Sequence, residues 1–197
     1  MCVYFVYLFN NQKDMSTKGT HTTADYLNFD TATNTANKLM KEDKTRIMGL
    51  YIIISINTGL RIGDTLTLTY EQLQGDTLES KTNKRRVIAL NEAIKNAISK
   101  YGHGKSGLIF ISQKGSVFTR QQINRNLKTA FARESKTLNI SSHTLRKTFG
   151  RQVFFTNNES EKALVYLSEL MNHQNQVVTR RYLGLRQEEL NNIYLNL

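Results

Sequence analysis

The stretch TRIMGLYIIISINTGLR, residues 45–61, predicts a central helix. Its apolar side chains fall on both faces, with Ile47, Leu50, Tyr51 and Ile54 on one and Met48, Ile52, Ile53 and Ile56 on the other. A helix that is apolar all round is buried on every side. Gly59 can end this helix, so Arg61 follows directly on rigid structure instead of lying on a loop.

Hydrophobic spacing predicts further helices along the chain. We expect them to begin at Asp30 or Thr31, at Asn91, near Arg120, at Ser141 or Ser142, and at Ser160. The core-facing residues expected on the last of these are Ala163, Leu167, Leu170 and Met171. Residues 75–91, GDTLESKTNKRRVIALN, favour two short strands joined by a turn at residues 82–83. The fold class is therefore α+β, mainly helical, with a small antiparallel sheet.

The N-terminal part of the chain differs in character from the rest. Residues 10–28, NNQKDMSTKGTHTTADYLN, are polar and aperiodic, which is typical of a tether. We expect residues 1–29 to be a flexible arm or linker and residues 30–197 to be one domain, ending in a helix over residues 183–197. The opening MCVYFVYLF is too short to span a bilayer and lacks the features of a signal peptide.

The net charge and the number of cysteines indicate which kind of partner the chain binds and in which cellular compartment it acts. The 197 residues contain 27 Lys and Arg against 16 Asp and Glu, a net charge of +11. Such a surplus favours a polyanionic partner, with nucleic acid first and an anionic membrane second, although a solvated basic surface is also compatible with it. The single Cys2 excludes a disulfide framework and favours a reducing, cytoplasmic setting.

A phosphate site is predicted at SSHTLRKTF, residues 141–149. His143 and Arg146 are three residues apart at a helix N-terminus, so they share one face beside free backbone N–H groups. Arginine suits a phosphate because its planar fork matches two oxygens at once. The sequence contains no Asp and Glu cluster with metal-ligand spacing, so we expect neither a metal nor another cofactor.

Four motifs in order give the chain a family resemblance. They are NTGLRIGDTLTLTYEQL with Arg61, ESKTNKRR with Lys81, HTLRKTF with His143 and Arg146, and MNHQNQVVTRRY with His173 and Tyr182. One such motif would be weak, because a His-x-x-Arg pair is frequent by chance. Together they resemble the catalytic domain of the tyrosine recombinase (phage integrase) family, over roughly residue 30 to the end.

The resemblance implies a role for each phosphate-binding residue. Arg61 and Arg146 would hold the scissile phosphate and neutralise the charge of its transition state. His143 would assist proton transfer, and His173 would donate a hydrogen bond to a phosphate oxygen. Asp64 matches the acidic position that supports the site.

The resemblance also implies the nucleophile and the acid. Tyr182 would attack to form a 3′-phosphotyrosyl bond, and Lys81 would protonate the leaving 5′-oxygen, with Lys84 as the alternative lysine. Without the other motifs, Tyr182 would be one of nine tyrosines and would be read as a packing residue. The other basic residues expected to contact DNA are Lys84, Arg85, Arg86, Arg120, Lys147, Arg180 and Arg181.

The function implied is site-specific recombination of double-stranded DNA, for integration or excision of a mobile element, in a prokaryotic cytoplasm and nucleoid. We expect a tetrameric synapse on DNA, a monomer off DNA and no membrane partner. Two alternatives stay open: a type IB topoisomerase-like enzyme, and a non-catalytic relative that modulates a full-length integrase.

The family's helical DNA-clamping domain is not matched by the first thirty residues, which predicts either a catalytic fragment or a minimal protein. Residues 183–197 would pack either on their own core or on a neighbouring copy.

Overall fold

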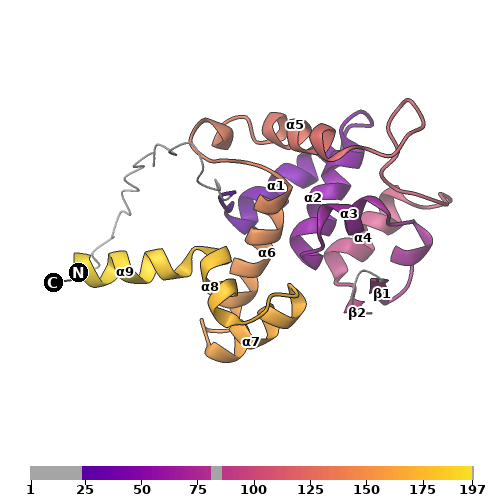
Figure 1. The fold of residues 1–197 in the computed structure, drawn as a ribbon. Coiled ribbons are helices and arrows are strands. Elements are labelled where there is room, and N and C mark those ends of the chain that lie inside the picture. Colours follow the sequence, from indigo (N-terminus) through magenta and orange to yellow (C-terminus); the bar gives the residue numbers. More distant parts are fainter. Residues whose placement is uncertain (1–23, 81–85, 197) are drawn as a thin grey trace, which may run out of the picture.

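The computed structural model describes residues 24–80 and 86–196, which are mainly helical with one two-stranded antiparallel sheet (Figure 1). This confirms the fold class. The elements in chain order are α1 (Phe29–Met40), α2 (Arg46–Thr58), α3 (Ile62–Leu66), η1 (Glu71–Leu73), β1 (Thr77–Ser80), β2 (Arg86–Ala89), α4 (Glu92–Tyr101), α5 (Arg120–Ala130), η2 (Glu134–Lys136), α6 (Ser142–Thr156), α7 (Glu161–Leu170), α8 (Gln176–Leu183) and α9 (Leu185–Leu195). None of the helices in these two segments is long and apolar enough to cross a bilayer.

Helix α2 is the buried centre that the sequence predicts. Leu50, Ile52, Ile54 and Ile56 are fully inaccessible to solvent, because α1, α4, α5 and α6 all pack against this helix. Gly59 ends it with a left-handed φ of 61°. A Cβ at this position would lie 2.3 Å from the Phe149 ring, so both the conformation and the space require glycine.

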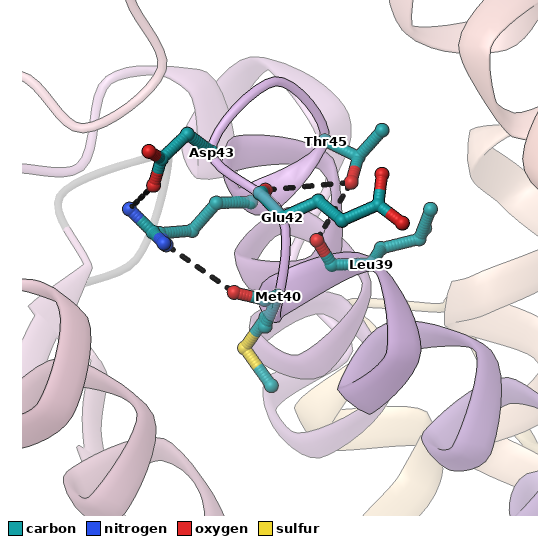
Figure 2. A network of polar contacts seen from close by, with 6 residues as sticks. Leu39, Met40, Glu42, Asp43 and Thr45 are labelled. Atoms are coloured by element: carbon teal, nitrogen blue, oxygen red, sulfur yellow. Dashed lines mark hydrogen bonds and ion pairs between the residues drawn. The ribbon is translucent and has the colours of Figure 1, made fainter.

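A short turn joins α1 to α2 and is held by polar contacts (Figure 2). The hydroxyl of Thr45 donates to the carbonyl of Leu39 at 2.7 Å, and Nε of Arg46 donates to the carbonyl of Met40 at 3.2 Å. Arg46 also forms an ion pair with Asp43. These contacts satisfy carbonyls at the end of α1 that have no partner within the helix, so the two helices form a tight hairpin.

Side-chain caps define where several helices begin. Asn91, Ser141 and Ser160 cap α4, α6 and α7, as the sequence predicts. The expected cap of α1 was wrong, because Asn28, and not Asp30 or Thr31, accepts a hydrogen bond from the backbone N–H of Thr31 at 3.1 Å. The expected burial of Leu170 was also wrong, since it is 43% exposed at the end of α7.

The predicted hairpin is present as β1 and β2. The strands are antiparallel, with Thr77 opposite Ala89 and Ser80 opposite Arg86. Leu78 is buried and anchors the sheet to the core. The expected turn at residues 82–83 lies outside the described residues.

Helix α6 links two hydrophobic clusters. Its N-terminal half contributes Leu145 to the main core around α2, and its C-terminal half contributes Phe154 to a second cluster with α7 and α8. Gly150 allows this second contact, because a Cβ there would lie 2.5 Å from Met171 and 2.6 Å from Leu183. Figure 1 shows α7 and α8 against one end of α6, and α9 extending away from them. Helix α6 therefore spans both clusters, with its first half in the main core.

Candidate functional site

The side chains of Arg61 and Arg146 meet at the C-terminal end of α7. Arg61 precedes α3 directly, and its Nη2 donates to the carbonyl of Met171 at 3.3 Å. Arg146, on the second turn of α6, donates to the same carbonyl from Nη2 at 2.8 Å and to the carbonyl of Gly59 from Nη1. Arg146 is buried, so its charge is poorly screened by solvent.

His143 lies in the first turn of α6, on the same side of the helix as Arg146. Its backbone N–H donates to the hydroxyl of Ser141, which caps the helix, at 3.3 Å. Burial lowers the pKa of the imidazole, and the positive charges of Arg146, Arg120 and Arg61 lower it further. These charges act on the imidazole because His143 and Arg146, three residues apart, lie on the same side of α6.

His173 approaches the same arginines from the loop between α7 and α8. Asn172 has a left-handed φ of 50°, and the backbone N–H of His173 donates to the carbonyl of Ser168 at 2.9 Å. After this reversal of the chain, Nδ1 of the imidazole lies 3.0 Å from the hydroxyl of Thr179. Burial, followed by the charges of Arg146 and Arg61, lowers the pKa of His173 to about 4. The imidazole is therefore neutral at pH 7.

Tyr182 lies near the end of α8 with its ring against the second hydrophobic cluster. The ring meets that of His173 edge to face, with 5.1 Å between centroids. The phenol donates to the backbone carbonyl of His143 at a long 3.4 Å. Burial raises the pKa of the phenol, although the charges of Arg146 and Arg61 oppose this. At neutral pH the phenol keeps its proton.

The structure thus brings together five of the six residues singled out from the sequence: Arg61, His143, Arg146, His173 and Tyr182. Lys81 and its alternative Lys84 lie outside the described residues. Asp64 is half-buried in the first turn of α3, three residues after Arg61, and its backbone carbonyl accepts from the hydroxyl of Thr67 at 3.0 Å. Across residues 24–80 and 86–196, no three His, Cys, Asp or Glu side chains group as metal ligands would.

The family was decided by comparison with known proteins. The model of the phage integrase family matches residues 29–189. The chain belongs to the phage integrase family. Among its relatives in that family, the probable integrase/recombinase YoeC of Bacillus subtilis is 32% identical over 144 residues, which are 69% of this chain and 76% of that protein. The tyrosine recombinase XerD of Lacticaseibacillus casei is 24% identical over 173 residues, 79% of this chain and 58% of that protein.

Solved structures agree on the fold of this integrase-family chain. The crystal structure of XerA recombinase superposes with a TM-score of 0.66 at 19% identity, over 91% of this chain and 66% of that one. XerH recombinase, in a post-cleavage complex with its palindromic difH substrate, gives 0.65 at 21% identity, over 89% of this chain and 54% of that one. The chain therefore spans between half and two thirds of the length of XerD and of these solved recombinases.

The remaining basic residues of the integrase-family chain differ in exposure. Arg120 and Arg181 are exposed, and Arg120 is close enough to His143 to influence its pKa. Arg180 is half-buried and forms an ion pair with Glu161. Lys84 and Arg85 lie outside the described residues, and only the backbone of Arg86 is described, in β2.

Lys147 does not fit the expected DNA contact. Its side chain is buried, and its ammonium donates to the carbonyl of Ala24 at 3.0 Å. Burial lowers its pKa. The spacing of α6 explains this outcome: Lys147 follows Arg146 by one residue, which turns it about 100° away from the arginine pair.

Sequence reasoning missed the groups that hold the site together. The carbonyl of Met171 accepts from both arginines, but a backbone atom leaves no signature in a sequence. Thr179 contacts Nδ1 of His173 at 3.0 Å, and its position one helical turn before Tyr182 was the available signal. Arg151 is buried and donates to the carbonyl of Leu183, beside Tyr182.

Proposed function

We propose that the chain is a site-specific DNA recombinase that cleaves and rejoins strands through a 3′-phosphotyrosyl intermediate, for the integration or excision of a mobile element. The observation that carries the proposal is the placement of the Tyr182 ring beside His173 and within the field of Arg61 and Arg146. A packing tyrosine needs no such neighbours. The names of the relatives, which include an integrase and tyrosine recombinases, support the same activity.

Arg61 and Arg146 bind the scissile phosphate. Both now donate to the carbonyl of Met171, so their N–H groups already point at one place, where a phosphate oxygen can compete for them. Guanidinium groups that are fixed in advance stabilise the charge that develops at phosphorus without reorganising during the reaction. The buried Arg146 contributes the stronger field of the two.

Tyr182 attacks phosphorus, and the 5′-oxygen leaves. Because the resting phenol is protonated, the reaction depends on positioning and on removal of its proton as the new bond forms. Lys81 supplies the proton to the 5′-oxygen, His143 assists proton transfer, and His173 contacts the phosphate. Asp64 supports the site from α3. One phosphodiester replaces another, so the strand can be rejoined by the reverse reaction without ATP.

The partner is double-stranded DNA. Arg120 and Arg181 are exposed and suit phosphate contacts, and we propose Arg180, Arg85 and Arg86 as further contacts from their places in the sequence. XerH, one of the structural neighbours, was solved bound to its difH DNA. We place this activity in residues 30–197, in a prokaryotic cytoplasm where the chain acts on nucleoid DNA. Residues 24–28 pack against α6, since Leu27 is buried and the carbonyl of Ala24 accepts from Lys147, and residues 1–23 of the expected arm lie outside the described residues.

Helix α9 assembles a tetrameric synapse from monomers. Ile193, Tyr194 and Leu195 are 60%, 75% and 82% exposed, so this part of α9 does not bury its apolar side chains on its own domain. Packing in trans explains that exposure better than packing in cis. The apolar groove beside His173, where Tyr166, Leu170 and Val177 are exposed, is a suitable acceptor on the neighbouring copy.

Covalent capture tests the activity. The protein is incubated without metal with nicked duplexes from the DNA that flanks its gene, and denaturing electrophoresis detects a protein–DNA adduct. We expect an adduct in the wild type and in Tyr101→Phe, a matched control at a half-buried tyrosine at the end of α4, but none in Tyr182→Phe. Strand exchange between two labelled duplexes separates recombination from topoisomerase-like relaxation. DNA binding without any adduct would support the non-catalytic alternative.

A further inference from the structure

A chain of polar contacts leads from the interior of α7 to His173. The hydroxyl of Ser168 donates to the carbonyl of Leu164 at 2.7 Å and lies 2.9 Å from the hydroxyl of Thr179. Thr179 Oγ1 lies in turn 3.0 Å from Nδ1 of His173. Ser168 is 7% exposed and Thr179 is fully buried, so these hydroxyls depend on each other and not on solvent.

Counting protons along this chain gives the state of the imidazole. Each hydroxyl has one proton to donate. If Ser168 gives its proton to Leu164, then its oxygen is the acceptor at the contact with Thr179, and Thr179 donates to Ser168. Thr179 then has no second proton to donate, so its oxygen can only accept from His173. The contact between them therefore requires a proton on Nδ1 of His173.

The other arrangements are less favourable or give the same result. Thr179 can instead donate to the carbonyl of Asn175, but that distance is 3.4 Å, and Nδ1 of His173 must still be the donor. Only if Ser168 donates to Thr179 can Thr179 donate to Nδ1. That arrangement gives up the 2.7 Å bond from Ser168 to Leu164, which is the shortest of the set.

We propose that Ser168 and Thr179 are positioning residues that hold His173 in the tautomer with its proton on Nδ1, so that Nε2 is a hydrogen-bond acceptor. The other ring nitrogen then carries a lone pair, on a ring that meets the Tyr182 ring edge to face at 5.1 Å between centroids. This differs from the donor role that the family resemblance implies for His173. The catalytic meaning of the tautomer rests on the proposed function, whereas the tautomer itself does not.

An acceptor at this position can take the proton of the nucleophile. As the Tyr182 oxygen forms its bond to phosphorus, its O–H bond breaks and the proton moves to Nε2 of His173. The P–O5′ bond breaks with its electron pair on the 5′-oxygen, which takes a proton from Lys81. The phosphate also offsets the charges of Arg61 and Arg146 that oppose protonation of His173, so the base becomes competent only when DNA is bound.

Nuclear magnetic resonance of the free protein tests the tautomer directly. Two-bond couplings from the ring carbons' protons to nitrogen-15 distinguish a protonated ring nitrogen from a bare one, and His173→Gln assigns the signal among the four histidines. We expect Nδ1 protonated and Nε2 bare at pH 7. The opposite pattern in the wild type would overturn the proposal while leaving the recombinase function intact.

Substitutions separate positioning from packing. Thr179→Val keeps the shape of the side chain but removes the hydroxyl, and Thr179→Ser keeps the hydroxyl. We expect Thr179→Val to shift the tautomer population and to slow adduct formation roughly tenfold or more with unchanged DNA affinity, and Thr179→Ser to restore both. If Thr179→Val changed only the unfolding temperature, or if Thr179→Ser lost the wild-type tautomer, the hydroxyls of Ser168 and Thr179 would have only a structural role. If the wild-type protein had the expected tautomer but formed no adduct, the result would count against the proposed function and not against the tautomer.

Discussion

Arg61 and Arg146 donate to the same oxygen atom, the backbone carbonyl of Met171, at 3.3 and 2.8 Å. This atom ends α7, while the two arginines come from the segment after α2 and from α6. One carbonyl therefore sets the separation of two positive charges that would otherwise repel each other. In the proposed function, a phosphate oxygen takes the place of this carbonyl between the two guanidinium groups.

Arg146→Lys is expected to abolish most of the cleavage activity. A lysine presents a single ammonium and cannot reach the carbonyls of Gly59 and Met171 together, so the phosphate loses a fixed, two-pronged donor. We expect adduct formation to fall by about 10²- to 10³-fold, as measured with nicked duplexes at saturating protein. Arg61→Lys, with one observed donor contact instead of two, should be less severe. Equal rates for Arg146→Lys and wild type would remove Arg146 from the site.

Glu188→Gln is expected to destabilise the fold. Glu188 pairs at 2.8 Å with Arg151, which is buried, lies 3.8 Å from the centre of the Tyr26 ring and donates to the carbonyl of Leu183. Removing the carboxylate leaves a buried guanidinium without its counter-charge. Because the Glu188 side chain is 45% exposed, we expect a loss of about 2 kcal/mol in the free energy of unfolding, below the value for a fully buried pair. Urea denaturation measures this loss.

Glu161→Gln is the matched control for that experiment. Glu161 pairs with Arg180, but its side chain is 70% exposed, and ion pairs of this kind contribute less than about 1 kcal/mol. A loss for Glu161→Gln as large as that for Glu188→Gln would contradict the view that burial of Arg151 decides the effect.

The sequence predicted what local patterns encode. The all-round apolar pattern of α2, the left-handed Gly59 and the caps at Asn91, Ser141 and Ser160 were all confirmed, because each depends on residues that are close together in the sequence. Motif order also predicted five residues that the fold brings together. Contacts between distant elements were not predictable: the inward turn of Lys147 depends on where Ala24 lies, and the exposure of Leu170 depends on what covers α7.

The stability of the fold should fall in mild acid because of His173. Its pKa is about 4 in the folded protein against an ordinary 6.5, so the unfolded chain binds the proton first. The contribution of the neutral His173 to the free energy of unfolding is fully present above about pH 7, and it is lost as the pH falls from 6.5 toward 4. Both proteins are unfolded with urea at pH 7 and at pH 5. With allowance for the partial exposure of His173, we expect the free energy of unfolding to fall between these pH values by about 1 kcal/mol less in His173→Gln than in the wild type. Parallel losses in the two proteins would contradict the lowered pKa.

Arg181→Gln should make DNA binding less sensitive to salt. Arg181 is exposed on α8, one residue before Tyr182, where a phosphate contact would release counterions. Removing one such contact reduces the slope of log K against log salt by about 1, which fluorescence anisotropy at several salt concentrations can measure. Lys100→Gln, at the last turn of α4 and outside the cluster, is the control with an unchanged slope. An unchanged slope for Arg181→Gln would exclude Arg181 from the interface.

Ile193→Gln should impair assembly on DNA without affecting the fold. Ile193 is 60% exposed on α9, so a polar side chain there changes the free energy of unfolding by no more than about 0.5 kcal/mol. If α9 docks on a neighbouring copy, the same change removes apolar contact from that interface. We expect native gels with two-site DNA to show singly occupied complexes in place of synapses. Asn192→Ala, a polar neighbour on the same helix, should retain synapses. If Ile193→Gln instead lowered the stability of the free protein, α9 would pack in cis and the exposed face would need another explanation.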